Sequence, residues 1–266
     1  MLLVVNVKNS NITLGGYNGV KLCFVAKMLS EKKYTADQYA IQLKEILALH
    51  SFSVDELDGA IIGSVVPELI MPLKDAILLL SGIKPLVLGP GLKTGLNILI
   101  DNPAELGADL VAAAVAALSL YPAPCIIYDF GTATTISVID KGRNFIGGMI
   151  SAGVSVSLEA ITNNAALLTH VSMETPPSII GKNSIHSLQA GIIYGTAAMV
   201  DDLSVRIEEE VGSKATVIVT GDLVNQIIFA VQRKVILNEY LVLEGLRIIY
   251  EKNRKAYHKM YRDCDK

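Results

Sequence analysis

The stretch Asp129-Phe130-Gly131-Thr132-Ala133-Thr134-Thr135 decides the fold, because it stands between two apolar runs. Residues 125–128 (Cys-Ile-Ile-Tyr) precede it, and residues 136–139 (Ile-Ser-Val-Ile) follow it. An apolar run, a short polar segment and a second apolar run predict two strands joined by a tight turn.

The N-terminus repeats this layout. Residues 2–5 are apolar, Asn6-Val7-Lys8-Asn9-Ser10-Asn11 is mostly polar, and residues 12–14 (Ile-Thr-Leu) begin a second strand. The repetition predicts two related halves, each built around a strand–turn–strand unit.

An acid and a glycine at such a turn suit phosphate binding. Together they bring backbone N–H groups and a carboxylate to one point, as a phosphate and its metal ion require. The second copy has both residues, Asp129 and Gly131, whereas the first has Asn6 and Lys8 in their places. A plain hairpin turn is the alternative, since Asp and Gly are common in turns. The hydroxyls of Thr132, Thr134 and Thr135 favour the phosphate loop, but turn chemistry alone leaves both interpretations open.

The composition excludes some classes of protein. Of the 266 residues, 51% are hydrophobic, which is enough for a sizeable core, and 18% are charged, which is below the usual quarter. This deficit suggests that part of the surface is buried in an oligomer. The net charge is −3, there is no Trp and aromatic residues make up 6%, so neither a basic stripe nor a stacking platform points to nucleic acid.

The cysteines and the apolar segments favour a cytoplasmic protein. Cys23, Cys125 and Cys264 are widely spaced and odd in number, which fits neither a disulfide framework nor a zinc site. The N-terminus lacks the pattern of a signal peptide. Residues 110–128 are uncharged over about the length of a membrane span. Pro122 and Pro124 interrupt them, so we expect a buried helix, a turn and a core strand, and no membrane.

Hydrophobic spacing predicts the other elements. In the first half we expect strands near 2–7, 11–16, 20–26, 59–65 and 84–88, and helices over 36–49, from Pro67 and over 103–120. In the second half we expect strands near 124–130, 133–140, 143–150 and 215–220, and helices near 153–167, 184–211, from Asp222 and near 240–256, before a polar, frayed tail. Three strands followed by alternating helices and strands occur twice, which predicts an α/β fold of two related domains over residues 1–118 and 119–266. We expect a cleft between the two turns, with Asn6 and Asp129 facing each other across it.

Three further motifs each have a functional and a structural interpretation. Asp109, in Gly107-Ala108-Asp109, is either a general base in a cleft or a favourable acid at the start of a helix. Residues 147–153, which hold three glycines, either let backbone approach a ligand or form an ordinary strand-to-helix turn. Asp222, after Gly221, is best explained as a helix cap.

In combination these motifs resemble the type III pantothenate kinase family over about residues 1–254. The residues that carry the resemblance, in their order and spacing, are Gly89-Pro90-Gly91-Leu92-Lys93-Thr94-Gly95-Leu96, Asp101-Asn102-Pro103, Gly107-Ala108-Asp109, the 129–135 segment, Gly147-Gly148, Ile180-Gly181-Lys182-Asn183 and Gln189-Ala190-Gly191-Ile192-Ile193-Tyr194-Gly195.

The resemblance implies the acetate and sugar kinase/Hsc70/actin fold, in which two ribonuclease H-like domains (duplicated βββαβα units) flank a nucleotide cleft. It also implies a homodimer. It further implies ATP with Mg²⁺, a monovalent cation (K⁺ or NH₄⁺), and pantothenate as phosphate acceptor in the first committed step to coenzyme A.

The resemblance also assigns roles by position. Asp109 matches the catalytic base for the pantothenate hydroxyl. Asn6, Lys8, Asn9 and Ser10 match the first phosphate loop, and Asp129, Gly131, Thr132 and Thr134 match the second, with Asp129 as the metal ligand. Gly147, Gly148 and Gly221 match the adenosine side. Gly89, Gly91 and Gly107 match the pantothenate loops, and Asn183 and Ser184 match a segment that reaches toward the substrate of the other subunit.

The departures from the family pattern lie in or next to the segments that the resemblance assigns to the phosphate loops, the catalytic base and the adenosine side. They are Asn6 for Asp, Lys8 for Gly, Leu110 for Arg, Ala152 for Pro and Asp222 for Gly. Two hypotheses follow: either Lys8 holds ATP phosphates in part of the metal's place and the protein is a kinase, or the chain keeps the fold for binding or regulation without turnover.

Overall fold

The computed structural model describes residues 1–164 and 171–262, with side chains up to residue 255. The chain forms two compact units, and both are discontinuous in sequence. The first contains residues 1–96, 102–116 and the chain from residue 241 onward, and the second contains residues 97–101 and 117–240. The C-terminal helix therefore groups with the N-terminal residues.

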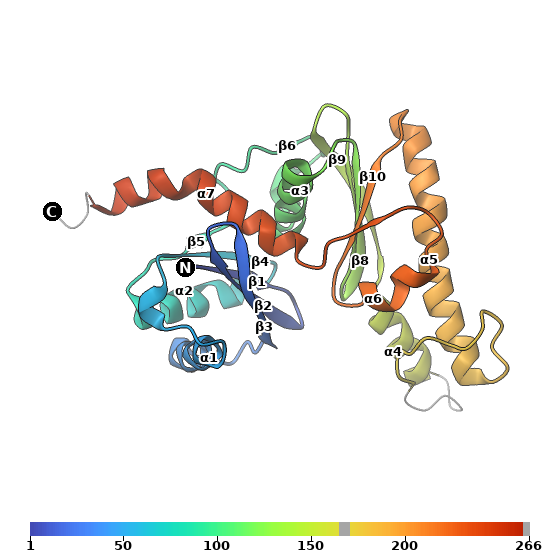
Figure 1. The fold of residues 1–266 in the computed structure, drawn as a ribbon, viewed down its shortest axis with the longest axis horizontal. Coiled ribbons are helices and arrows are strands. Elements are labelled where there is room, and N and C mark those ends of the chain that lie inside the picture. The colour runs from blue at the N-terminus through green and yellow to red at the C-terminus, as the bar shows by residue number, and fades with distance from the viewer. Residues whose placement is uncertain (165–170, 263–266) are drawn as a thin grey trace. The chain divides into compact units, whose positions relative to one another are not determined.

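The first unit is built on a five-stranded mixed sheet with the order β3-β2-β1-β4-β5. Antiparallel pairing joins β1 to β2 and β2 to β3, whereas β1, β4 and β5 run parallel. Its elements are β1 (Leu2–Val7), β2 (Asn11–Asn18), β3 (Lys21–Leu29), α1 (Ala36–Leu49), η1 (Val54–Glu56), β4 (Gly59–Ser64), α2 (Pro67–Ser81), β5 (Leu86–Val87), η2 (Pro103–Glu105), α3 (Ala108–Leu120, which passes into the second unit after residue 116) and α7 (Leu241–Arg262). Figure 1 shows α1 and α2 side by side against this sheet.

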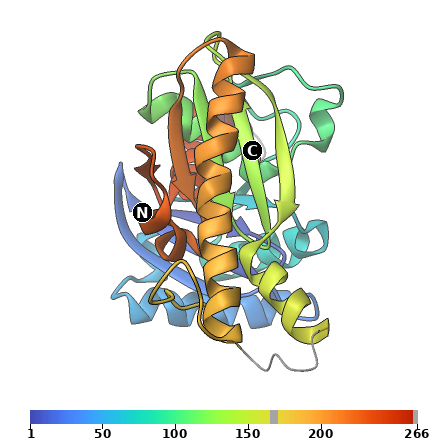
Figure 2. The same ribbon diagram turned by 90° about the vertical axis from the view of Figure 1, so that its right-hand side faces the viewer.

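The second unit repeats this topology. Its sheet has the order β11-β10-β7-β8-β9-β6, so that β7 to β11 pair in the same order and directions as β1 to β5. Its elements are β6 (Asn97–Ile98), β7 (Cys125–Phe130), β8 (Ala133–Ile139), β9 (Asn144–Ala152), α4 (Val154–Asn164), α5 (Ser184–Val211), β10 (Thr216–Thr220), α6 (Val224–Ile227), η3 (Ile228–Ala230) and β11 (Ile236–Leu237). Figure 2 shows α5 running lengthwise across one face of the sheet. The predicted duplicated α/β fold is confirmed.

Alternation along the two central strands places the turn residues on the same face in each unit. Leu3, Val5 and Val7 of β1 pack into the core formed with α1 and α2. The side chain of Asn6 therefore points to the opposite face of its sheet. In β7 the residues Ile126, Tyr128 and Phe130 pack into the core with α5, so Asp129 points away from α5 in the same manner.

Helix α7 covers the face of the first sheet to which Asn6 belongs, and strand glycines make room for it. A side chain at Gly63 would lie 2.8 Å from Leu246, and one at Gly59 would overlap the hydroxyl of Tyr250. Gly245 in turn lies against the backbone of Ala112 in α3, where even a Cβ would not fit. Glycines thus bring α7 close to both the sheet and the neighbouring helix.

Several predicted boundaries were wrong. The helix expected over 103–120 is a 3₁₀ turn followed by α3, because residues 106 and 107 break it. The helix expected from Asp222 begins at Val224 with Leu223 at its N-cap, so Asp222 is not the cap. The final helix extends through Arg262, although a frayed tail was expected from about residue 255. The last part of the helix expected over 153–167 and Cys264 fall outside the described residues.

The apolar segment 110–128 folds as predicted, into most of α3, a turn and the first part of β7. Within the described parts of the chain, no helix is both long and apolar enough to cross a membrane.

A buried acid fixes the end of α5. Glu208 is only 4% exposed and forms ion pairs with Lys214 at 2.8 Å and Arg233 at 2.7 Å, and it also accepts a hydrogen bond from the N–H of Ala215. Burial opposes the ionisation of Glu208, but the hydrogen bonds outweigh it and hold its pKa at about 2. The carboxylate therefore joins α5 to the segments that lead into β10 and β11.

The contacts of the Glu208 carboxylate predict that the stability of the protein depends on pH. Since the folded-state pKa of Glu208 lies below its ordinary value of 4.5, its contribution is present above about pH 4.5 and is lost as the pH falls toward 2. Urea denaturation from pH 7 to pH 2 should show that Glu208→Gln lowers the free energy of unfolding at neutral pH and that the difference from wild type shrinks in acid. The neighbouring exposed Glu209→Gln is the control. A Glu208→Gln deficit that is constant across this range would contradict the assignment.

Candidate functional site

The turn after β7 is closely packed. Asp129 is the penultimate residue of β7, is 6% exposed, and pairs in register with Thr135 on β8 and Thr220 on β10. The N–H of Gly131 donates a hydrogen bond to the carbonyl of Ala133 at 3.2 Å, which closes the turn. Asp129, Gly131 and Thr132 therefore lie together at this turn. Thr134 on β8 pairs with Phe130, which faces α5, so its side chain lies on the opposite face of the sheet from that of Asp129.

Two glycines from other elements enclose this turn. A Cβ at Gly221, which has φ +104°, would lie 2.5 Å from the backbone nitrogen of Phe130 and 2.6 Å from Oδ1 of Asp129. A Cβ at Gly153 would lie 2.2 Å from the carbonyl oxygen of Gly131, and the N–H of Gly153 donates to the carbonyl of Thr132 at 3.1 Å. Only glycine allows these approaches, so the backbone at both positions comes directly against the turn.

Gly153 also begins a helix. It joins β9 to α4, whose first residue is Val154, and the carbonyl of Gly153 accepts from Ser157 in the first turn of that helix. The partly positive N-terminus of α4 consequently lies beside the turn, where anionic groups are favoured. Gly153 thus stands in a strand-to-helix turn, one of the two interpretations that the sequence left open for residues 147–153.

A cavity of about 260 Å³ adjoins the same end of the sheet. It lies among the ends of β8 and β9, α4 and α5, and its polar lining consists of the hydroxyls of Thr134, Ser151, Ser157 and Thr196. Ala152, where the family has Pro, belongs to the lining as well. Hydroxyls of this kind can donate to or accept from a polar ligand.

Four of the site residues predicted in the second unit lie away from the turn after β7: two are in β9 and two are at the start of α5. Gly148 pairs with Ser137, three residues along β9 from the Thr134–Ser151 pair, or about 10 Å at the rise of a strand. Gly147, with φ +139°, sits at a shift in register, and a side chain on Gly148 would strike the carbonyl of Ile136. Both glycines thus have a structural reason within the sheet.

The other two stand at the start of α5. Asn183 caps this helix by accepting from the N–H of His186 at 2.8 Å, and Ser184 is its first residue. Both are exposed. Their assigned role toward another subunit stays a prediction.

The first unit has an equivalent turn that is built differently. Asn6, 5% exposed, occupies the position in β1 that Asp129 occupies in β7, and pairs with Thr13 on β2 and Gly63 on β4. The following turn spans Lys8, Asn9 and Ser10, and the N–H of Lys8 donates to the carbonyl of Asn11 at 2.9 Å.

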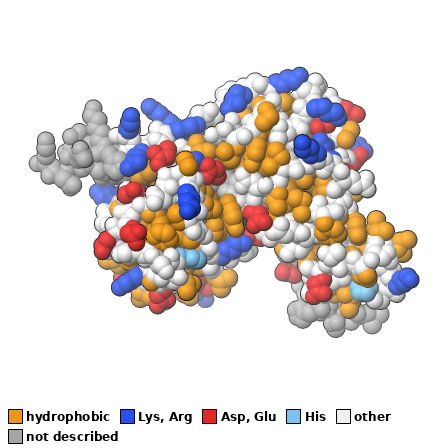
Figure 3. All heavy atoms as spheres, in the orientation of Figure 1, with side chains coloured by type: hydrophobic (Ala, Val, Ile, Leu, Met, Phe, Trp, Pro, Cys, Tyr) orange, Lys and Arg blue, Asp and Glu red, His pale blue; other side chains and the backbone are white. Residues whose placement is uncertain are grey.

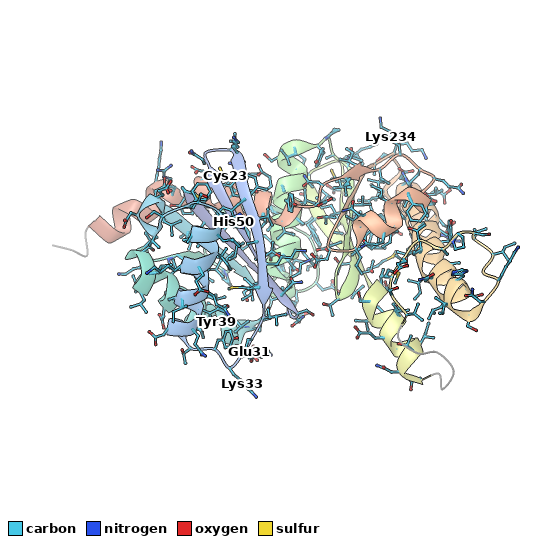
Figure 4. The ribbon with its side chains drawn as sticks, turned by 60° about the horizontal axis from the view of Figure 1, so that its bottom comes forward. Cys23, Glu31, Lys33, Tyr39, His50 and Lys234 are labelled. Carbon is cyan, nitrogen blue, oxygen red and sulfur yellow. The ribbon has the colours of Figure 1, made fainter. Side chains whose placement is uncertain are left out.

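A serine outside the turn holds it in place. The hydroxyl of Ser30, just after β3, donates to the carbonyl of Lys8 at 2.6 Å, and its N–H donates to the carbonyl of Ser10 at 3.2 Å. The next residue, Glu31, accepts at its carbonyl from the hydroxyl of Tyr39 on α1 at 2.8 Å (Figure 4). The turn that carries Lys8 is therefore connected to α1 through this segment, which no local sequence signal indicated.

Asp109 lies near the same end of the first sheet. Gly107 immediately precedes α3, and its missing side chain leaves room for the Asp109 carboxylate, because a Cβ there would lie 2.6 Å from Oδ1. The same Cβ would be 3.6 Å from Val65, whose N–H donates to the carbonyl of Val7 at the end of β1. The Gly107–Asp109 segment thus lies near the end of β1, which Asn6 and Lys8 flank at Val7. Asp109 is half-buried and occupies the first turn of α3, next to Leu110.

The loop of residues 89–95 leaves β5 at this edge as well. The N–H of Leu88 donates to the carbonyl of Ile62 at 2.8 Å, which continues the parallel pairing of β4 with β5. Gly91 and Gly95 have φ +96° and +74°, which favours glycine, and the space where a side chain of Gly89 would stand is open. The three glycines therefore leave backbone accessible in this loop, beside the exposed side chains of Pro90 and Lys93.

The described residues contain no cluster of three or more His, Cys, Asp or Glu that could hold a metal ion. Two free cysteines are described. Cys23 is exposed, whereas Cys125 at the start of β7 is buried, and burial raises its pKa to about 11, so its thiol stays protonated at neutral pH.

Comparison with solved structures agrees with the fold. A protein of Campylobacter jejuni described as a Baf family transcriptional activator has a TM-score of 0.60, 17% identity, and coverage of 95% of this chain and 99% of that one. The activator of the 2-hydroxyisocaproyl-CoA dehydratase from Clostridium difficile, solved with bound ADPNP, has a TM-score of 0.56, 11% identity and 97% coverage of both chains. At these identities the likeness shows the fold alone.

Sequence comparison is more specific. The family model for type III pantothenate kinase matches residues 2–206. A type III pantothenate kinase of Exiguobacterium sp. is 42% identical over 96% of this chain and its own full length, and one of Geobacter sulfurreducens is 42% identical with the same coverage. That of Bacillus cytotoxicus is 40% identical over 97% of this chain and 98% of its own. On these matches, the chain belongs to the type III pantothenate kinase family.

Proposed function

We propose that this chain transfers the γ-phosphoryl group of ATP to the hydroxyl of pantothenate, yielding 4'-phosphopantothenate for coenzyme A synthesis. It is similar to proteins named as type III pantothenate kinases, and the similarity covers 98% or more of their length. The observation that most supports the proposal is the turn after β7, where the carboxylate of Asp129 lies against the backbone of Gly221 and the turn itself lies against Gly153 at the start of α4.

ATP and Mg²⁺ fit the residues of this turn. Backbone approach at two glycines and the N-terminus of α4 suit phosphate oxygens. Mg²⁺ in phosphotransfer sites takes one or two carboxylates together with substrate phosphates, so the single acid Asp129 is a sufficient protein ligand. We propose that Gly131, Thr132 and Thr134 contact the phosphates. The metal, when bound, neutralises charge on the transferred group.

For the acceptor, we propose that Asp109 takes the proton of the pantothenate hydroxyl. Its carboxylate stands at the first turn of α3, and the backbone of Gly107 leaves it room. The loops with Gly89, Gly91 and Gly107 are the proposed pantothenate contacts. A cytoplasmic reaction that uses K⁺ or NH₄⁺ as monovalent cation completes the proposal.

A second candidate function rests on the altered residues. Asn6 is a weaker Mg²⁺ ligand than a carboxylate, and Leu110 cannot donate hydrogen bonds as Arg does. Asp222 adds a negative charge directly after Gly221. A family member without turnover, with a binding or regulatory role, is therefore the alternative to be tested.

The base distinguishes these two functions. A coupled assay with ATP, pantothenate, Mg²⁺ and K⁺ should show turnover in the wild type, and Asp109→Asn should lower kcat roughly 10²–10⁴-fold with little change in ATP affinity. Asp75→Asn, an exposed acid on α2, is the matched control and should leave kcat unchanged. Wild-type turnover no higher than that of Asp109→Asn would favour the non-catalytic alternative.

Lys8 provides a second test. We propose that its ammonium binds ATP phosphate where the family has a glycine, since Ser30 fixes the carbonyl of Lys8 and so the base of the side chain. A charge-assisted contact of this kind corresponds to roughly 10–100-fold in Kd. Isothermal titration of ATP should show this loss for both Lys8→Gly and Lys8→Met, because Met keeps the bulk and removes the charge.

The opposite result would identify a degenerate loop. In that case Asn6→Asp combined with Lys8→Gly would strengthen Mg²⁺-dependent ATP binding above wild type, and full turnover would further need Leu110→Arg and Asp222→Gly. Tight Mg²⁺-dependent binding by wild type that neither Lys8 variant changes would remove Lys8 from the site.

We further propose a homodimer formed through the second unit. Large apolar side chains are exposed around α4 and the start of α5, including Ile150 at 75%, Ile180 at 74% and Ile185 at 48%. Figure 3 shows hydrophobic side chains at the surface of this region, at its lower right.

Light scattering at micromolar concentration should give twice the 28.5 kDa mass of one chain. Ile180→Asp together with Ile185→Asp should give the monomer mass, because a dimer interface does not tolerate two unpaired charges. Leu49→Asp, on an equally exposed residue of α1, should leave the dimer intact. A wild-type monomer would refute the proposal.

A further inference from the structure

The loop of residues 89–95 depends on a distant helix for its conformation. Its beginning is fixed by Leu88 on the edge of the sheet, and within it the N–H of Leu92 donates to the carbonyl of Gly89 at 3.3 Å. The centre of the loop is held by α7, which lies about 160 residues further along the chain.

Asn253 of α7 binds both backbone groups of a single loop residue. Its Oδ1 accepts from the N–H of Lys93 at 3.0 Å, and its Nδ2 donates to the carbonyl of Lys93 at 3.0 Å. The same Nδ2 also donates to the carbonyl of Ile249 one turn earlier in α7, at 2.7 Å. Asn253 is 6% exposed, so these bonds compete little with water.

A second contact lies next to the first. The ammonium of Lys252 donates to the carbonyl of Thr94 at 2.6 Å, beside Gly95. A side chain at Gly95 would lie 2.9 Å from this ammonium. Two successive residues of α7 thus hold two successive peptide groups of the loop.

The helix itself is firmly placed. Leu246 and Tyr250 fill the spaces above Gly63 and Gly59, and Gly245 touches the backbone of Ala112 in α3. Because α3 begins at the Gly107–Asp109 segment, α7 contacts both the loop and the helix that carries the proposed base.

We propose that Asn253, assisted by Lys252, positions the 89–95 loop for the phosphate acceptor. The proposal rests on the proposed function, since it takes this loop to bind pantothenate. Asn253 is a positioning residue that acts through the backbone of Lys93 and touches no substrate. The bidentate contact fixes the orientation of the Lys93 peptide and thereby the presentation of Gly89 to Leu92.

The test uses the full chain and two readouts. Hydrogen–deuterium exchange of the loop amides needs no activity, and steady-state kinetics with varied pantothenate or varied ATP reports on the acceptor side separately. Asn253→Leu should speed exchange of residues 91–96 about tenfold. It should also raise the pantothenate KM about tenfold while the ATP KM stays within about twofold.

Two further variants keep the outcome decisive. Glu244→Gln breaks the ion pair between Glu244 and Arg247, which lies on the same helix but away from the loop. Because Arg247 is only 11% exposed, this variant controls for a general loosening of α7. It should leave loop exchange and the pantothenate KM near wild type. If Asn253→Leu does not fold, Asn253→Ser replaces it, because Ser is too short to reach Lys93 and keeps a polar group in the site.

Unchanged loop exchange in the folded Asn253 variant would overturn the proposal. Equal changes in Glu244→Gln, or equal changes in both KM values, would overturn it too. Absence of pantothenate phosphorylation in the wild type would instead count against the proposed function, and loop exchange would still decide whether Asn253 holds the loop.

Discussion

Backbone packed directly on backbone is the constraint on which the second unit's candidate site depends. Gly153 and Gly221 come from opposite sides to the turn after β7, at separations that leave no room for a Cβ. Peptide groups therefore form much of the turn, together with the carboxylate of Asp129 and the exposed side chain of Thr132. Each segment holds the next in place.

The two copies of the unit support the turn after their first strand in different ways. In the second, glycines let main chain support main chain. In the first, Ser30 braces the turn through its hydroxyl and its N–H, and the turn then carries the long side chain of Lys8. A duplicated topology has thus kept its strand order and register while its two turns have diverged in chemistry, one toward a carboxylate and the other toward a cation.

The parts of this protein that follow local patterns could be predicted from the sequence. Alternation and turn residues indicated the central strands, and spacing gave α1 and α5 to the residue. The short strands β6 and β11 were missed, because each is defined by pairing with its partner strand, whereas the equally short β5 lies within the predicted strand at 84–88. The proximity of Asp129 to Gly131 followed from the motif. The contacts of Gly153, Ser30 and Asn253 did not, since each joins segments that only the folded chain brings together.

The return of α7 to the first sheet has a consequence for synthesis on the ribosome. Strands β1, β2 and β4 emerge early, yet Leu246 and Tyr250, which fill the hollows over Gly63 and Gly59, are made only after the residues of the second unit. Until they emerge, one face of the first sheet lacks its covering helix, whereas the second unit is already complete by residue 240. The first sheet therefore cannot gain its complete core until the chain of the second unit has been synthesised.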